Sequence, residues 1–280
     1  AANWSGDALP GLNDLVFIAL DNGSSVVLNS GSHTIAGLTT TAGNALSISA
    51  GSLTLTGMSA LAGDLTLSGS GTLVTNGRLD ATRFTQTGGT FNGPGDFFVS
   101  TAFSQTGGSH TGIGRTMLGS AVSFAPGSYT FNRDFDIEGT LNHTSGTLVV
   151  AANRTVTVDG ALNWTSGSTI TGSGTLLLAE GSVSTLNANT NGGHLVLSGI
   201  TVNNAGTVNY TSEGRQVLIN DGTTFNNTGR FNFASDGVVS ENSGNGGNFN
   251  NSGTLAKTGG TGTSGFASQV RFNNLDGGTV

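Results

Sequence analysis

Three acidic residues recur at equal spacing in the middle of the chain, and carboxylates are the side chains whose pattern most suggests chemistry. Glu138, Asp159 and Glu180 are each followed by glycine, and the interval from each acid to the next is the same. If one turn of a repeating structure spans that interval, the three carboxylates stack about 5 Å apart. Like charges at that distance repel unless they are protonated or share a cation, and carboxylate oxygens suit calcium. The spacing predicts either a calcium site at these three residues or turn residues splayed into solvent.

Carboxylates are also the catalytic groups of polysaccharide-degrading enzymes. A hydrolase needs two acids, one of them protonated, and a lyase needs acids that hold calcium together with an Arg or Lys base. Arg133 and Arg154 are the cations nearest to the acids in sequence, and the chain has no Asp-Asp pair, no Gly-His-Gly and no Arg-x-Lys. We therefore expect no catalytic residues, with a polysaccharide lyase or glycoside hydrolase as the enzymatic alternative.

The histidines and the absence of cysteine narrow the remaining chemistry. Of His33, His110, His143 and His194, the first two share a Gly-Ser-His context but lie about four repeats apart, too far to share one metal ion. We expect single solvated or stacked histidines. With no Cys, the chain has no thiolate metal ligand, no Cys nucleophile and no disulfide. No cofactor is predicted other than the calcium considered above.

The elements that position these residues follow from a repeat. One sequence motif consists of an apolar residue, two asparagines and, shortly after them, a glycine. It begins at Val202, Phe225, Phe249 and Phe272, at nearly equal intervals. Short apolar strands and Gly-rich turns that recur at so short a period are typical of a solenoid, with one coil per period. The two Asn columns, beginning at Asn203 and Asn204, are expected to hydrogen-bond from coil to coil.

The same apolar position can be followed towards the N-terminus, at slightly shorter intervals. A second marker, Gly followed by Ser or Thr, recurs from Gly31-Ser32 to Gly253-Thr254. We expect one stacked row formed by Leu46, Leu65, Phe84, Phe103, Val122, Leu141, Leu162, Val183, Val202, Phe225, Phe249 and Phe272.

Local alternation supplies the strands of each coil. Segments such as Leu53-Thr-Leu-Thr and Val156-Thr-Val-Asp alternate apolar and polar residues, as strands with one buried face do. The hexapeptide pattern of left-handed β-helices and the calcium-binding nonapeptide are absent. The prediction is an all-β, right-handed parallel β-helix of about 13 coils.

Composition agrees with this fold and excludes some partners. Gly is 47 of 280 residues, charged residues are 9% and the net charge is −7, so polarity is supplied by Thr, Ser and Asn. Nine scattered basic residues give no electrostatic surface for nucleic acid or an anionic membrane. No apolar run in the sequence is long enough to form a membrane-spanning helix.

Two segments are distinguished along the chain. Residues 1–25 break the repeat, with Trp4, Pro10 and an apolar run beginning at Leu15, and are predicted to cap the first coil. Residues 26–280 are predicted to form the repeats. Because the sequence stops inside a repeat at Val280, we expect either that a longer rod continues or that the open end pairs head-to-tail with another molecule.

The Asn-Asn-x-Gly-Thr repeats and the Gly-Thr-Leu strands of residues 26–280 resemble secreted bacterial β-helix surface proteins of the filamentous-haemagglutinin and autotransporter-passenger kind. The resemblance is one of repeat texture. It implies export, an extracellular or cell-surface location and a role as adhesin or stalk. Assembly into filaments is compatible with that role. The implied partner is a host or neighbouring-cell surface, through a glycan or matrix ligand.

Overall fold

The computed structural model describes residue 4 and residues 7–20, 23–124, 127–165, 167–188, 193–212 and 214–280, which divide into two units, residues 1–120 and 121–280. Across these ranges the regular elements are all β-strands, without a helix, and the described strands pair in parallel. Together they form a parallel β-solenoid of about 12 turns, against about 13 predicted. The predicted fold class is confirmed, and the right-handed sense stays a prediction.

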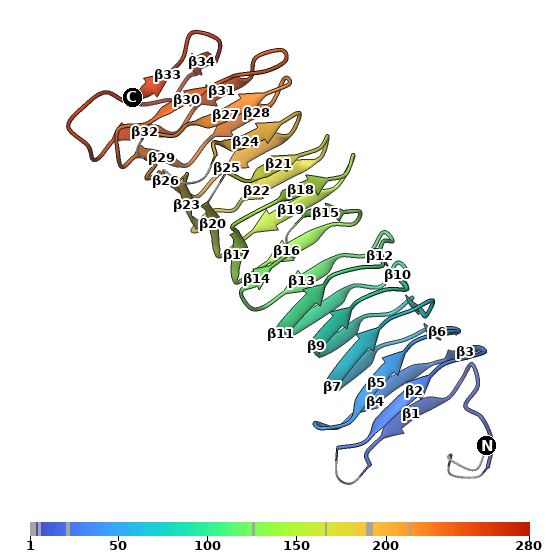
Figure 1. The fold of residues 1–280 in the computed structure, drawn as a ribbon. Coiled ribbons are helices and arrows are strands. Elements are labelled where there is room, and N and C mark those ends of the chain that lie inside the picture. The colour runs from blue at the N-terminus through green and yellow to red at the C-terminus, as the bar shows by residue number, and fades with distance from the viewer. Residues whose placement is uncertain are drawn as a thin grey trace. The chain divides into compact units, whose positions relative to one another are not determined.

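The first unit contains two parallel sheets, drawn in blue to green in Figure 1. The longer sheet consists of β1 (Leu15–Ile18), β2 (Ser25–Leu28), β4 (Gly37–Thr40), β5 (Ala45–Ile48), β7 (Ser59–Leu67), β9 (Leu79–Gln86), β11 (Phe97–Gln105) and β13 (Thr116–Leu118). The shorter sheet consists of β3 (Ser32–Ile35), β6 (Ser52–Leu55), β8 (Thr72–Thr75), β10 (Thr90–Asn92) and β12 (Ser109–His110). Each strand pairs with its equivalent one coil earlier or later.

The second unit has three strands in a typical coil and therefore three sheets. Sheet 1 consists of β16 (Phe135–Ile137), β19 (Thr155–Val158), β22 (Thr175–Leu178), β25 (Thr201–Asn204), β28 (Thr224–Asn227), β31 (Asn248–Asn251) and β34 (Arg271–Asn274). Sheet 2 consists of β14 (Val122–Ser123), β17 (Thr140–His143), β20 (Ala161–Thr165), β23 (Val183–Asn187), β26 (Thr207–Tyr210), β29 (Arg230–Phe233) and β32 (Thr254–Lys257). Sheet 3 consists of β15 (Ser128–Phe131), β18 (Thr147–Val150), β21 (Thr169–Thr171), β24 (Leu195–Ser198), β27 (Val217–Asn220), β30 (Val238–Ser240) and β33 (Gly265–Phe266).

The alternation in the sequence decides which side chains enter the core. In β6, β19 and β28 every second residue is buried, and the residues between them are half-exposed Thr, Ser or Asn. Stacking coils bring like side chains into contact inside the second unit. The rings of Phe225 and Phe249, one coil apart, stack with their centroids 4.8 Å apart, and Phe231 meets both of them edge-on.

The predicted single row of apolar residues is confirmed in the first unit and is wrong in the second. Leu46, Leu65, Phe84 and Phe103 lie in register. In the second unit the row occupies two sheets. Val122, Leu141 and Leu162 are in register in sheet 2, and Val202, Phe225, Phe249 and Phe272 are in register in sheet 1.

The error arises at β23, the strand that follows Leu162 by one coil in sheet 2. The register of β20 with β23 places Ser184 beside Leu162, and Val183, which was assigned to the row, points outwards and is 50% exposed. The row of sheet 2 continues from Ser184 to Val208, Phe231 and Leu255. Since a slip of one residue moves a side chain to the opposite face of a strand, interval counting alone could not place this coil.

The glycine of the Asn-Asn-x-Gly motif has a steric cause. A Cβ atom at Gly229 would overlap the carbonyl oxygen of Gly206, and one at Gly253 would overlap the carbonyl oxygen of Gly229. The turns between sheets 1 and 2 therefore stack backbone on backbone, which only glycine permits.

The segment predicted as a cap, residues 1–25, contains β1. This strand pairs in parallel with β4, from Leu15 opposite Gly37 to Ile18 opposite Thr40. The parallel ladder therefore already includes Leu15. A capping role for the residues before it stays a prediction.

Replacing Phe225 with Ala should lower the free energy of unfolding by about 3–5 kcal/mol, because a buried ring stacked on its neighbour leaves a cavity. Thr224→Ala is the matched control, since its half-exposed side chain should contribute less than about 0.5 kcal/mol. Urea denaturation followed by circular dichroism measures both. Equal losses in the two variants would contradict this core assignment.

Candidate functional sites

The three predicted calcium ligands lie at the corner between sheets 1 and 2 of the second unit. The register of β16 with β19 places Glu138 beside Asp159, and the backbone amide of Asp159 donates to the carbonyl oxygen of Ile137 at 2.9 Å. The next coil interrupts the column. The register of β19 with β22 places Ala179 beside Asp159, so Glu180 lies one residue further along, in the turn.

The carboxylates are not brought together as a metal site. Glu138, Asp159 and Glu180 are exposed, and in the described parts of the chain no three acidic or histidine side chains are grouped so as to hold a metal ion. The neighbouring Asp134 has a structural contact instead, since its Oδ1 accepts a hydrogen bond of 2.9 Å from the backbone amide of Thr155 one coil away. The arrangement favours turn residues over calcium ligands.

The two cations considered for an enzymatic site are placed differently. Arg133 is completely buried, and Arg154 is half-buried in the turn before β19. A buried guanidinium does not meet a polymeric substrate at the surface. The sequence contained a signal for this burial, because Arg133 lies two residues from both Phe131 and Phe135 and is therefore in phase with their buried positions.

The histidines are separated, as predicted. His110 is buried in the first unit with its ring stacked on Phe91 at 4.5 Å. His143 is buried in the second unit, where its Nε2 lies 2.9 Å from the carbonyl oxygen of Thr169, so that nitrogen carries the hydrogen and donates. Burial lowers the pKa of His143, and the bond to Thr169 opposes this only in part. His143 is therefore a neutral residue of the core.

The Asn-Asn columns are confirmed, and they form two different ladders. The outer ladder contains Asn203, Asn226, Asn250 and Asn273, on the solvent side of sheet 1. The amide nitrogen of each later Asn donates to Oδ1 of the Asn one coil earlier, over 2.8–2.9 Å. These side chains are half-exposed or exposed, so the ladder fixes a polar surface.

The inner ladder contains Asn204, Asn227, Asn251 and Asn274, and it runs in the opposite direction. Each of the first three donates to Oδ1 of the Asn one coil later at 2.7 Å. Each of these amide nitrogens also donates to a backbone carbonyl oxygen. The acceptors are Arg230 for Asn204, Thr254 for Asn227 and Thr279 for Asn251. Asn204, Asn227 and Asn251 are buried, so these bonds satisfy polar groups in the core.

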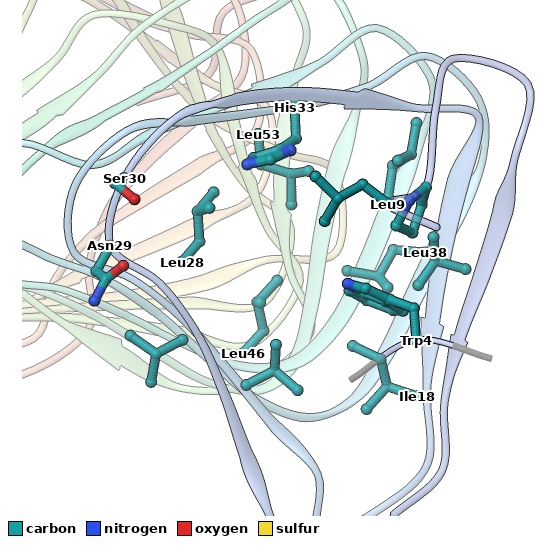
Figure 2. A pocket seen from close by; sticks show the side chains of 15 residues that line it. Trp4, Leu9, Ile18, Leu28, Asn29, Ser30, His33, Leu38, Leu46 and Leu53 are labelled. Atoms are coloured by element: carbon teal, nitrogen blue, oxygen red, sulfur yellow. The ribbon is translucent and has the colours of Figure 1, made fainter. Parts of the chain in front are cut away.

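A cavity of about 280 Å³ opens at the start of the first unit, and sequence analysis did not predict it. Its walls are mainly apolar and come from the first coils together with Trp4, Leu9 and Pro10. Figure 2 shows Trp4 and Leu9 on one side, Asn29 and Ser30 on the other, and Leu28 and Leu46 between them. The apolar run that begins at Leu15 was the available signal, since Val16 and Ile18 line the cavity.

The same end of the first unit has an apolar outer surface. Leu15 and Phe17, on the outward face of β1, are 81% and 65% exposed. Leu9, Leu12, Leu20 and Val27 are also exposed. Elsewhere the outward positions of the strands are mostly Thr, Ser and Asn, so this end differs in chemistry from the rest of the described surface.

Among the described residues no helix has the length and apolarity needed to cross a membrane. Comparison with protein-family models, with curated proteins and with solved structures gives no match.

The buried neutral His143 predicts a pH dependence. Its pKa in the folded state lies below the unfolded value near 6.5, so its contribution to stability is complete above that pH and is lost as the pH falls further. The urea midpoint, followed by the fluorescence of the buried Trp164, should therefore fall between pH 7.5 and 5. His143→Gln should reduce this fall, whereas His194→Gln should retain most of it. An unchanged fall in His143→Gln would exclude His143 as the cause.

Replacing an Asn with Ala should lower the free energy of unfolding by different amounts in the two ladders. Asn227→Ala leaves the amide of Asn204, Oδ1 of Asn251 and the carbonyl of Thr254 without their buried partner, and should cost about 3 kcal/mol or more. Asn226→Ala, its neighbour on the outer ladder, should cost about 1 kcal/mol because water replaces the lost bonds. Urea denaturation of the two variants measures the difference. A larger loss in Asn226→Ala would mean that the outer ladder is the buried one.

Proposed function

We propose that this chain is a non-catalytic, extracellular β-solenoid that acts as an adhesin or structural stalk and binds a neutral polar polymer, a glycan or matrix component, along its outer ladders. One observation carries the proposal. Sheet 1 of the second unit presents hydrogen-bonding side chains in straight columns that are already fixed by contacts with one another.

The columns form a regular grid. One outward column of sheet 1 contains Thr155, Thr175, Thr201, Thr224 and Asn248 in register. Its last three members lie two positions before Asn203, Asn226 and Asn250 of the outer ladder. Neighbouring coils repeat these groups about every 4.8 Å, and the two columns lie roughly 6.6 Å apart along each strand. A polymer with repeated hydroxyl or amide groups can meet several such groups at once.

The chemistry of the grid suits an uncharged ligand. A primary amide has two N–H groups and an oxygen with two lone pairs, and each ladder bond uses one of each. The remaining donor and acceptor are left for a ligand. Because the ladder already restricts the side-chain rotamers, binding a polymer costs less conformational entropy than at a flexible surface.

The low content of charged residues is compatible with a surface that binds an uncharged polymer. Charged residues are 9% of the chain, so a long stacked surface is built without columns of like charge. A polysaccharide lyase or hydrolase would instead need a group of acids or a bound cation near the polymer. The acids at the corner of sheets 1 and 2 point into solvent one coil apart, and Glu180 is displaced from the column.

The test uses the whole chain immobilised on beads and a panel of neutral glycans and matrix polymers. We expect retention without cleavage of at least one polymer. The double variant Asn226→Ala with Asn250→Ala should retain about tenfold less, since several contacts repeat along the ladder. Asn163→Ala is the matched control, because it removes an outward Asn–Asn bond from sheet 2 instead.

Retention that is equal in all variants would contradict binding on sheet 1. Release of shortened polymer fragments by the chain would contradict the non-catalytic role and favour the enzymatic alternative. Circular dichroism melts of each variant confirm that the compared proteins are folded.

A further inference from the structure

A recess of about 310 Å³ lies on the outer surface of the first unit, where β5, β7 and β9 pair side by side (Figure 1). Paired coils continue on both sides of it, through β2 before and β11 after, so the recess is not formed by an end of the chain. Sites for small molecules have volumes of about 300–1,000 Å³. The recess therefore has room for one small ring.

The recess has a cause in the pairing of the strands, which bend around a corner of the coil. The register of β7 with β9 shifts between Leu61 and Asp64, because two residues bridge the corner in β7 and only Thr82 bridges it in β9. The register shifts back between Val99 and Ala102, where β11 again has two residues at the corner. Because the shortest corner lies between two longer ones, the outer surface is hollowed there.

Four of the lining residues have no side chain or only a methyl group. They are Gly43, Ala45, Ala62 and Gly63. Gly63 is required, since a Cβ atom there would overlap the carbonyl oxygen of Asn44. Ala45 is half-buried and Ala62 is exposed, so their methyl groups give the recess a small apolar surface.

The polar groups of the recess are an acid and a base in one outward column. In this column Asp64 and Arg83 are adjacent, with Ala45 before them and Ala102 after them. Nη1 of Arg83 lies 3.8 Å from Oδ1 of Asp64, and the two side chains are 59% and 60% exposed. This separation is longer than a hydrogen bond. Both groups are therefore able to bond to a ligand placed between them.

The pair suits a ligand with neighbouring hydroxyl groups. The guanidinium of Arg83 only donates hydrogen bonds and the carboxylate of Asp64 only accepts them, whereas a hydroxyl does both. One hydroxyl of a sugar can accept from Arg83 while the next donates to Asp64. An ionic ligand is favoured less, because each charge of the pair opposes the attraction of the other and both are screened by solvent.

A row of hydroxyl side chains extends the site along the surface. Two positions after the column of the ion pair, the outward residues in register are Ser47, Thr66, Thr85 and Ser104. A sugar polymer held at the ion pair can hydrogen-bond to this row through its next residues. A free amino acid would reach only the pair, so the surroundings favour a glycan.

We propose that this recess binds one hexopyranose residue of a neutral glycan. Asp64 and Arg83 hold two neighbouring hydroxyls, and the methyl groups of Ala45 and Ala62 contact the apolar face of the ring. The site lies in the first unit and uses neither Asn ladder, so it is a binding site in addition to the one in the proposed function.

The test is an NMR titration of the whole chain, carrying isotopically labelled alanine methyl groups, with maltotriose, cellotriose and mannotriose. The methyl resonances of Ala45 and Ala62 should shift with at least one trisaccharide and saturate below about 50 mM, with a Kd of about 1–10 mM. The methyl resonance of Ala161, a half-buried residue of the second unit, should not move.

Two single variants test the ion pair. Asp64→Ala and Arg83→Ala should each raise the Kd at least about fivefold, because each removes a charged hydrogen-bond partner. Alanine already occupies both neighbouring positions of this outward column, so the fold should be retained. Circular dichroism melts check this.

A matched control and a filled recess separate the site from charge in general. Asp80→Ala removes the carboxylate of another exposed pair, in which Oδ1 of Asp80 lies 2.7 Å from Nε of Arg78, and should leave the Kd unchanged. Ala62→Leu keeps Asp64 and Arg83 but fills the recess, and should abolish the saturable shift of Ala45.

Three results would overturn the proposal. They are no saturable shift of Ala45 and Ala62 with any of the trisaccharides, an unchanged Kd in both ion-pair variants, and saturation by glycine alone, which would show a small zwitterion as the occupant. In the double variant Asn226→Ala with Asn250→Ala the shifts should persist. Failure of this proposal and failure of the proposed function are therefore separate results.

Discussion

Parallel pairing of each coil with the next is the constraint on which the rest of this structure depends. It places chemically equivalent residues about 4.8 Å apart over many coils. A column of identical side chains stabilises the fold when those side chains stack on or hydrogen-bond to one another. A column of like charges destabilises it. Phe225 stacks on Phe249, and Asn bonds to Asn in both ladders.

Two positions in the second unit show how a charged residue fits under this constraint, one by stacking on neutral groups and one by interrupting the column. Arg230 occupies a column between Thr207 and Thr254, and its Nε donates to Oδ1 of Asn232 at 2.7 Å. Glu138 and Asp159 are adjacent, but the next position of that column is Ala179. Both cases avoid three like charges in succession, which offers a physical reason for the low charge content of the chain.

The two Asn ladders show how one residue type serves two purposes in a single strand. The inner ladder lies in the core and satisfies carbonyl groups of the turns, whereas the outer ladder organises the surface. Their opposite donor directions also mean that the amide dipoles of neighbouring columns oppose each other. The glycine of the turn completes the motif, because the coils approach backbone to backbone at Gly206, Gly229 and Gly253. The proposed ligand surface is a consequence of the outer ladder.

The sequence by itself determined the all-β parallel solenoid, the alternation of buried and outward residues, and both Asn columns. These follow from local period and from side chains that bond to copies of themselves, so spacing is enough to reveal them. Only the tertiary structure decided which sheet each repeat enters. Turn lengths vary between coils, so equal intervals joined Leu162 to Val183 and Val202, although pairing places Ser184 beside Leu162. A difference of one residue in turn length also moves Glu180 out of register with Asp159, which lies beside Ala179 instead. Register depends on which residues pair across coils and not on their distance along the chain.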